Sequence, residues 1–281
     1  MTVHRECVRH TFMIKAVIKK TLYRFFPRTA TALFSARDRA HSHRVIAGWG
    51  CPAINEALIA RYGSRVLGGP FAGMTLTPAT RKEQLGPCLL GLYESELHPV
   101  WKQVFAGSYP QVIDVGAKFG YYAVGLARRF PGSRVFAFDT DHWARRALRE
   151  MIAANDVSNV EVLRYCDPGW LTRNLAPGAL IVCDCEGYEG TLFGTRPIAH
   201  LATATLVVET HDTMVPGTTE RLRAALAATH RLEEISTEAS LRACPVDIGF
   251  LDERQRELAT KEVRPPQWFL HGVPKAGPRK A

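Results

Sequence analysis

The chain has 281 residues and a mass of 31.2 kDa, with 46% hydrophobic and 22% charged residues, the composition of an ordinary folded protein. This composition excludes a disordered chain, a collagen and a small disulfide scaffold. The formal net charge of +9 is concentrated at the ends, because residues 1–45 carry +8 and the tail after Pro274 carries +3. The body from Val45 to Pro274 therefore carries −2, which argues against a basic groove and makes nucleic acid a disfavoured partner.

Cysteine content and hydropathy indicate a cellular location. The seven cysteines form an odd number without a CxxC pair, which fits reduced thiols in a cytosolic protein. No apolar run approaches the roughly 20 residues that cross a bilayer, and no uninterrupted hydrophobic segment near the N-terminus resembles a signal peptide. We therefore expect a cytoplasmic protein.

Residues 12–26 have the pattern of a basic amphipathic helix. Apolar side chains recur at Ile14, Ile18, Leu22 and Phe25, with lysines and arginines on the other sides, until Pro27 interrupts the pattern. Such a helix can attach to an anionic membrane surface or to an acidic partner. Alternatively, it packs on its own domain and solvates its charged face, as any surface helix does.

From residue 65 onward, short apolar segments alternate with helical patterns. After glycine-rich β-like pieces over 66–76 and a predicted helix over 89–105, the strands expected are 111–115, 134–138, 160–163, 179–183, 204–208, 232–235 and 268–270, with helices over 121–130, 142–154, 219–229 and 253–261. This alternation predicts an α/β fold, a Rossmann-like seven-stranded, mostly parallel sheet with helices on both faces. The predicted domains are a basic helical N-terminal extension (1–64), the sheet domain (65–274) and a basic tail (275–281).

The glycine turn after the first strand of this sheet is the most informative segment. Asp114 ends the apolar strand, and Gly116 and Gly120 stand four residues apart before a helix, whereas dinucleotide sites use G-x-G-x-x-G. A carboxylate at Asp114 would repel a pyrophosphate but suits a ligand with an ammonium and a sulfonium group, such as S-adenosylmethionine. Asp139 closes the next strand, where an acidic side chain accepts hydrogen bonds from ribose hydroxyls.

Four segments carry a resemblance to a known family. They are IDVGAKFGYYAVGLA, VFAFDTD, ALIVCDCEGYEGTLF and LVVETHD. Together they resemble the FkbM-like branch of the class I S-adenosylmethionine-dependent methyltransferases, over residues 65–272. The D-x-E-G-x-E motif at Asp184–Glu189 narrows the resemblance to this branch.

The resemblance implies roles for individual residues around S-adenosylmethionine and the acceptor. Asp139 would hold the ribose, and Asp167 would contact adenine unless it is only the N-cap of the helix that follows. The amino-acid end of the cofactor would lie among Asp114, Gly116, Ala117 and Gly120. The acceptor, a small molecule or a glycan, would meet Tyr93, Glu94, Glu186 and Glu189.

A cluster of acids and one histidine follows two neighbouring strands of the predicted sheet. Asp184 follows one strand, and Glu209 and His211 close the next. Such a set can bind a divalent cation or accept a proton, or it can consist of solvated loop residues. His211 is the candidate base for a hydroxyl acceptor, with Asp184 or Glu209 as its partner or alternative. We assign no metal ligands; Cys183 and Cys185 are expected to be buried thiols.

These features predict an S-adenosylmethionine-dependent methyltransferase that methylates a hydroxyl of a sugar or another small metabolite. Three other functions stay open. An NAD-dependent oxidoreductase of the same fold is disfavoured by the missing G-x-G-x-x-G motif. A noncatalytic scaffold would use the basic N-terminal arm to bind a membrane or a partner. A nucleic-acid methyltransferase is disfavoured by the slightly acidic body. It is also disfavoured because Asp184-Cys185-Glu186-Gly187 stands where amino-methylating enzymes place an Asn-Pro-Pro-aromatic signature.

Overall fold

The computed structural model describes residues 27–194, 197–238 and 243–275. The chain divides into two compact units, Met1–Arg44 and Val45–Ala281, and the helix α2 (Pro27–Gly48) contains the boundary between them. The predicted amphipathic helix over 12–26 and the tail beyond Lys275 lie outside the described residues. The sheet and every other helix described below belong to the second unit.

Helix α3 (Cys51–Tyr62) is part of the core of the second unit. Its Ile54 and Leu58 side chains are buried, and the side-chain amide of Asn55 donates to the carbonyl oxygen of Glu83 at 2.8 Å. By compactness the second unit begins at Val45, and the domain boundary at residue 65 stays a prediction. In the sequence the apolar face of this helix looks like that of any amphipathic extension; only its packing partners show that it is core.

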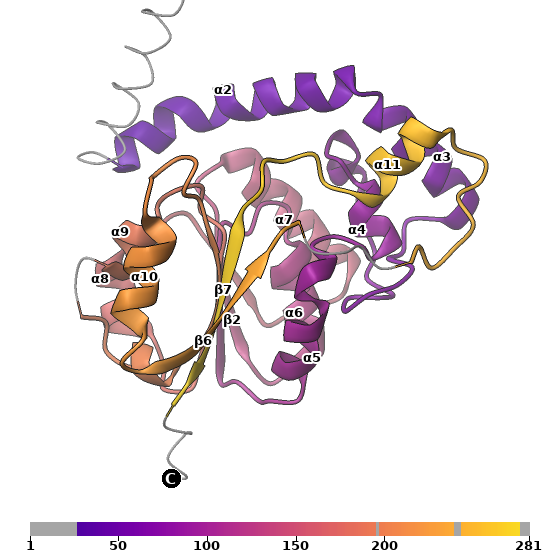
Figure 1. The fold of residues 1–281 in the computed structure, drawn as a ribbon. Coiled ribbons are helices and arrows are strands. Elements are labelled where there is room, and N and C mark those ends of the chain that lie inside the picture. The colour runs from indigo at the N-terminus through magenta and orange to yellow at the C-terminus, as the bar shows by residue number, and fades with distance from the viewer. Residues whose placement is uncertain (1–26, 195–196, 239–242, 276–281) are drawn as a thin grey trace, which may run out of the picture. The chain divides into compact units, whose positions relative to one another are not determined.

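The sheet has seven strands in the order β3-β2-β1-β4-β5-β7-β6. Neighbouring strands from β3 to β5 are parallel, and β7 is antiparallel to both β5 and β6. This arrangement confirms the predicted α/β, seven-stranded and mostly parallel sheet (Figure 1). The strands are β1 (Gln111–Val115), β2 (Arg134–Phe138), β3 (Val160–Leu163), β4 (Leu180–Cys183), β5 (Thr205–Thr210), β6 (His230–Ser236) and β7 (Trp268–Pro274).

Successive side chains of the strands enter two different hydrophobic cores, one on each face of the sheet. In β1, Val112 packs in the first core and Ile113 in the second, as the two-residue period of a strand requires. Helices cover both faces, as Figure 1 shows. The first core is closed by α5 (His98–Phe105), α6 (Tyr121–Arg129) and α7 (His142–Ala154), and the second by α8 (Pro168–Asn174), α9 (Glu189–Gly194) and α10 (Thr218–Leu226).

The predicted single helix over 89–105 is divided into three pieces: α4 (Gly86–Leu90), the 3-10 turn η2 (Ser95–Leu97) and α5. Gly91 ends α4 in a left-handed conformation with φ 71°, and a Cβ atom there would lie 2.1 Å from the carbonyl oxygen of Gly68. The close contact with a distant segment imposes this break, which helical periodicity does not reveal. The β-like pieces over 66–76 form only an isolated bridge between Arg65 and Thr75.

Three elements remain: η1 (Pro78–Lys82), η3 (Leu201–Thr203) and α11 (Glu253–Thr260). Helix α11 matches its predicted position and begins with a capping box, in which Asp252 and Gln255 each accept the other's backbone N–H, a strong local start signal. None of the helices in the described part of the chain is both long enough and apolar enough to span a membrane.

Candidate functional site

Four neighbouring strands bring the candidate residues to one edge of the sheet. β1 lies between β2 and β4, and β5 follows β4, so the segments after these strands meet where parallel sheets bind ligands. Gly116, with φ 91°, approaches the end of β4 so closely that a Cβ atom would lie 1.6 Å from the carbonyl oxygen of Asp184. This glycine therefore joins the turn after β1 to the segment that carries the acidic cluster.

Asp139 organises the turn after β1. Its Oδ2 accepts from the backbone N–H of Lys118 at 2.8 Å, and its Oδ1 accepts from that of Asp141 at 2.8 Å. Ala117 donates its backbone N–H to the carbonyl oxygen of Phe138 at 2.9 Å. Asp139 is half-buried, and each carboxylate oxygen has a second lone pair. It thus supports the predicted cofactor turn and can still accept hydrogen bonds from hydroxyl groups.

Gly120 begins α6 with φ 96°, and a Cβ atom there would lie 2.3 Å from Cδ1 of Leu148 on α7. The glycine is required by the close packing of the turn on this helix. Asp167 accepts from the backbone N–H of Trp170 at 2.7 Å and so forms the N-cap of α8, the structural alternative considered for it. Its contact with adenine stays a prediction.

Asp114 carries a carboxylate that the protein itself does not fully satisfy. The residue is 3% exposed, and its Oδ2 atom is buried without a hydrogen-bond partner among the described residues. Burial, followed by the charge of the neighbouring Asp184, raises the pKa of Asp114 to about 8. A positively charged ligand would relieve this position, which fits the ammonium and sulfonium groups of S-adenosylmethionine.

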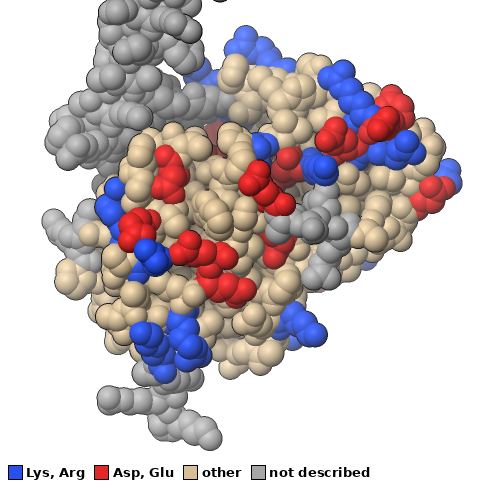
Figure 2. Space-filling model, in the orientation of Figure 1, with Lys and Arg blue, Asp and Glu red and all other residues tan. Residues whose placement is uncertain are grey.

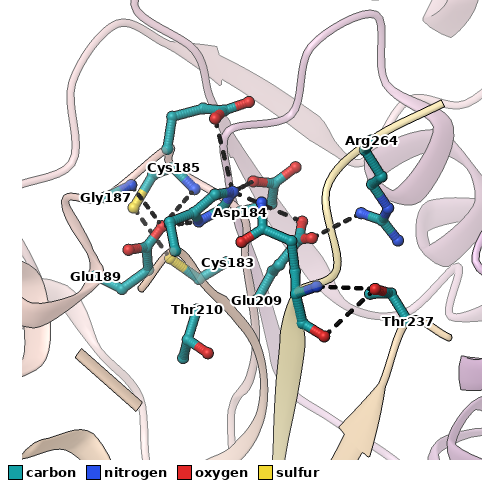
Figure 3. Close-up of polar contacts among 12 residues, drawn as sticks. Cys183, Asp184, Cys185, Gly187, Glu189, Glu209, Thr210, Thr237 and Arg264 are labelled. Carbon is teal, nitrogen blue, oxygen red and sulfur yellow. Dashed lines mark hydrogen bonds and ion pairs between the residues drawn. The ribbon is translucent and has the colours of Figure 1, made fainter. Parts of the chain in front are cut away.

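His211 lies at the centre of the acidic cluster and is 2% exposed. Its Nδ1 atom is 2.8 Å from Oε1 of Glu189. Its Nε2 atom faces Oδ1 of Asp184 at 3.5 Å, Oε2 of Glu186 at 3.6 Å and Oε2 of Glu209 at 4.0 Å. Figure 3 shows Asp184 after β4, Glu189 at the start of α9 and Glu209 on β5 converging on one place.

Glu189 holds the imidazole of His211 in place through its contact with Nδ1. Its side chain is fully buried, and Oε1 also accepts from the backbone N–H groups of Cys185 at 3.3 Å and Gly187 at 3.0 Å. In this conformation the Glu189 side chain has no exposed surface and contacts His211, and its expected substrate contact stays a prediction. Glu186, by contrast, has a side chain that is 69% exposed and remains available.

The cluster changes the protonation of its members. Burial lowers the pKa of His211, but the hydrogen bond to Glu189 and the charge of Asp184 outweigh it and raise the pKa to about 9. Burial and the nearby Glu186 raise the pKa of Asp184 to about 7, with His211 opposing. His211 therefore carries its proton at neutral pH in this arrangement, and proton removal from an acceptor has to involve the cluster as a whole.

Arg264 connects the cluster to the segment before α5. Its Nη1 atom is 2.6 Å from Oε1 of Glu209 and 3.5 Å from Oε1 of Glu94, and its Nη2 atom is 3.2 Å from Oε1 of Glu96. Tyr122 donates its hydroxyl to the other oxygen of Glu94. Figure 3 shows the ion pair between Arg264 and Glu209. Burial, Asp184 and Glu94 raise the pKa of Glu209, and Arg264 opposes them.

Sequence reasoning did not identify Arg264, because the segment around it shows no periodicity and arginine carries no local motif. Glu94 has a side chain only 2% exposed and pairs with Arg264, and its expected acceptor contact stays a prediction. Tyr93 is half-buried and packs edge-on against Tyr121, with ring centroids 5.1 Å apart. Only Glu186 and Tyr93 of the four predicted acceptor residues thus keep side chains with appreciable exposure.

The remaining polar groups near the strand ends lie outside the cluster. Asp212 accepts the hydroxyl of Thr219 on α10, and the Cys183 and Cys185 sulfurs are 3.4 Å apart. Among the described residues, one group has the ligand types and spacing of a metal site: Asp184, Glu186 and His211, with one ligand atom from each all within 4.8 Å of one another. Acidic side chains also gather across the middle of the face in Figure 2, with lysines and arginines nearer its margin.

Comparison with known proteins gives partial matches in sequence and in fold. No protein-family model matches the chain. Two curated relatives are named tRNA (guanine-N(7)-)-methyltransferase: one from Burkholderia lata, 29% identical, and one from Burkholderia ambifaria, 26% identical, each over 98 residues. Each alignment covers 35% of this chain and 38% of the relative, so the chain matches less than half of the length of these proteins.

A solved structure described as an rRNA methylase from Streptococcus thermophilus matches with a TM-score of 0.44 and 12% identity, over 63% of this chain and 96% of that one. At this TM-score the match carries no further inference, and the fold rests on the strand order. That order, with β7 antiparallel between β5 and β6, defines a Rossmann-like methyltransferase fold. Both curated relatives are named as methyltransferases.

The relatives also correct one expectation. Nucleic acid was a disfavoured partner on the ground that the body carries a slightly negative net charge, and this prediction is wrong, because both curated relatives are named as methyltransferases of tRNA. Net charge sums over the whole body and does not report the local surface that an acceptor meets. An RNA acceptor therefore has to be tested beside small molecules.

Proposed function

We propose that the protein transfers a methyl group from S-adenosylmethionine to a hydroxyl group of a sugar or another small metabolite, as a member of the FkbM-like branch. The observation that supports this most directly is the convergence of Asp184, Glu186 and His211 after β4 and β5, next to the turn after β1. Carboxylates and an imidazole are the groups that orient a hydroxyl and handle its proton.

The cofactor side of the proposed site is formed by the ends of β1 and β2. When bound, S-adenosylmethionine would supply an electrophilic methyl group. Asp114 offers a buried carboxylate to its cationic end, and Asp139 offers free lone pairs to its ribose. The turn residues Gly116, Ala117 and Gly120 give the close backbone surface, and Asp167 lies at the start of α8 for the predicted adenine contact.

On the acceptor side, the chain mainly has to orient a hydroxyl group and receive its proton. The exposed Glu186 carboxylate and the Nε2 atom of His211 face the same space, 3.6 Å apart. Because Glu189 holds the other ring nitrogen, the imidazole cannot rotate away. In this proposal Asp184, Glu209 and His211 together receive the proton of the acceptor hydroxyl. This group of three residues acts as the base in place of His211 alone.

Calorimetric binding of S-adenosylhomocysteine to the purified full-length protein tests the cofactor assignment. We expect binding in the micromolar range, about −8 kcal/mol, and a loss of at least tenfold in Asp139→Asn. Glu161→Gln, a change on the exposed surface of β3, is the matched control and should bind as the unmodified protein does. No binding by a folded sample would refute the proposal and favour the noncatalytic scaffold, and binding of NADH instead would favour the oxidoreductase.

A second candidate acceptor, tRNA, is favoured by the two curated relatives. A transfer assay with radiolabelled S-adenosylmethionine separates the two acceptors. The protein is incubated with a small-metabolite and sugar fraction or with bulk tRNA, and the label incorporated into each is measured. Transfer to the small-molecule fraction supports the proposal. Transfer to tRNA alone would replace it with RNA methylation.

We also propose that the protein is cytoplasmic and that residues 12–26 bring it to an anionic membrane surface. The pattern of lysines and arginines around an apolar stripe supports this. Sedimentation with phosphatidylserine vesicles, compared with neutral vesicles, tests it. Deleting residues 1–44 should abolish sedimentation and leave S-adenosylhomocysteine binding intact; equal sedimentation with and without the segment would refute the membrane contact.

A further inference from the structure

The Nε2 atom of His211 faces polar atoms with which it makes no hydrogen bond of normal length. It faces three carboxylates at 3.5–4.0 Å, distances longer than good hydrogen bonds. Oδ1 of Asp184, the oxygen on this side, is buried without a hydrogen-bond partner among the described residues. A nearly fully buried imidazole and a buried carboxylate oxygen thus face each other without satisfying each other.

The dimensions of this space match a small metal ion. Metal–nitrogen and metal–oxygen bonds of about 2.1 Å place neighbouring ligand atoms roughly 3.0 Å apart in an octahedral site and roughly 3.4 Å apart in a tetrahedral one. Nε2 of His211 lies 3.5 Å from Oδ1 of Asp184 and 3.6 Å from Oε2 of Glu186. With the three ligand atoms all within 4.8 Å of one another, a cation between them could draw them to the spacing of a coordination shell.

The second ring nitrogen of His211 is held as metal-bound histidines are held. A ligating histidine almost always donates its other N–H to a carboxylate or a carbonyl group, which fixes the ring and its tautomer. Here Nδ1 lies 2.8 Å from Oε1 of the fully buried Glu189, and two backbone N–H groups fix that oxygen in turn. This contact directs Nε2 toward Asp184 and Glu186, and a bound cation would take the place of the Nε2 proton.

We propose that Asp184, Glu186 and His211 bind one divalent cation, with Glu189 as the positioning residue that orients the histidine. Two carboxylates and one imidazole suit cations such as Mn²⁺, Mg²⁺ or Zn²⁺. Water or an acceptor oxygen would fill the remaining positions on the exposed side, where Glu186 lies. The orientation of an acceptor hydroxyl by this ion rests on the proposed function, whereas the binding of the ion does not.

Electron paramagnetic resonance of Mn²⁺ with chelator-treated full-length protein tests the site without cofactor or acceptor. We expect one bound Mn²⁺ per chain and affinity at least about tenfold lower in Glu186→Gln. Because this side chain is 69% exposed, its substitution does not threaten folding. The matched control is Glu257→Gln on α11, where the side chain is 66% exposed and pairs only with Lys261 among the ion pairs described; it should bind Mn²⁺ as the unmodified protein does.

Pulsed resonance measurements identify the ligand and the positioning residue. A nitrogen coupling to the bound Mn²⁺ should be present in the unmodified protein and absent in His211→Gln. Glu189→Gln should weaken binding about tenfold and alter the coupling without removing it. Absence of bound Mn²⁺ at millimolar concentration, or equal binding by Glu186→Gln and the control, would overturn the proposal. Since no S-adenosyl compound is present, a failure of cofactor binding leaves these outcomes unaffected.

Discussion

Replacing Asp114 by asparagine should stabilise the protein at neutral pH. The side chain is 3% exposed, and burial, followed by Asp184, raises its pKa from 3.8 to about 8. In the unfolded chain the same carboxylate ionises near its ordinary value, so the folded state binds more protons between pH 4 and 8. Stability from this group is complete below pH 4 and is lost as pH rises through about 8.

The size of this effect follows from the pKa. Each pH unit above the ordinary value costs about 1.4 kcal/mol, so between pH 3.8 and 7 the loss is on the order of 4 kcal/mol for this buried group. The Asp114→Asn variant would avoid this pH-dependent loss, because asparagine ionises in neither the folded nor the unfolded state. Its amide nitrogen lacks the partner that Oδ2 also lacks, which reduces the gain to about 1–3 kcal/mol.

Urea unfolding at pH 5, 6, 7 and 8 measures the prediction. Asp114→Asn should show a higher midpoint at pH 7 and a flatter decline of stability from pH 5 to 8 than the unmodified protein. Asp156→Asn, the same chemical change at an exposed turn residue, is the control. If Asp114→Asn has the same pH dependence as the unmodified protein, the pKa of Asp114 is not raised in the folded state. The description of Asp114 as an unsatisfied buried acid would then be incorrect.

Three further predictions concern packing and buried charge. Arg264→Gln leaves Glu94 and Glu209, both 2% exposed, without their cation and should cost about 3–5 kcal/mol in urea unfolding, whereas Arg146→Gln on the surface of α7 should cost less than about 1 kcal/mol. Gly116→Ala should greatly reduce the yield of folded protein, because the added Cβ would lie 1.6 Å from a carbonyl oxygen. The control Gly132→Ala should not, because nothing lies within 4 Å of its added Cβ. Similar thermal midpoints for the two variants would contradict this packing. Burial lowers the pKa of His230, so the unfolded chain takes up a proton below about pH 6.5 that the folded chain does not. The stability of the unmodified protein should therefore decrease as the pH is lowered below about 6.5, and that of His230→Gln should decrease less steeply. Calorimetry at pH 5 and 7 would show the difference.

Much of the fold was determined by local patterns in the sequence. Apolar runs such as 111–115 and the helical pattern of 142–154 appear in the structure with those boundaries, because side-chain periodicity and strong caps such as Asp141 act within a few residues. The end of a strand is also predicted from local sequence, and the carboxyl ends of parallel strands lie at the same edge of the sheet. For this reason the sequence by itself predicted that Asp184, Glu209 and His211 would meet.

Only the tertiary structure decided which of these groups are satisfied and by what. Glu189 belongs to the same motif as Asp184, yet it lies fully buried beneath His211, while Glu186 between them is exposed. Arg264 reaches Glu209 across 55 positions of the chain, and α3 joins a core whose other members lie far along the sequence. Such contacts depend on burial and on long-range packing, which no short pattern records, and they determine the charge, orientation and accessibility of the site.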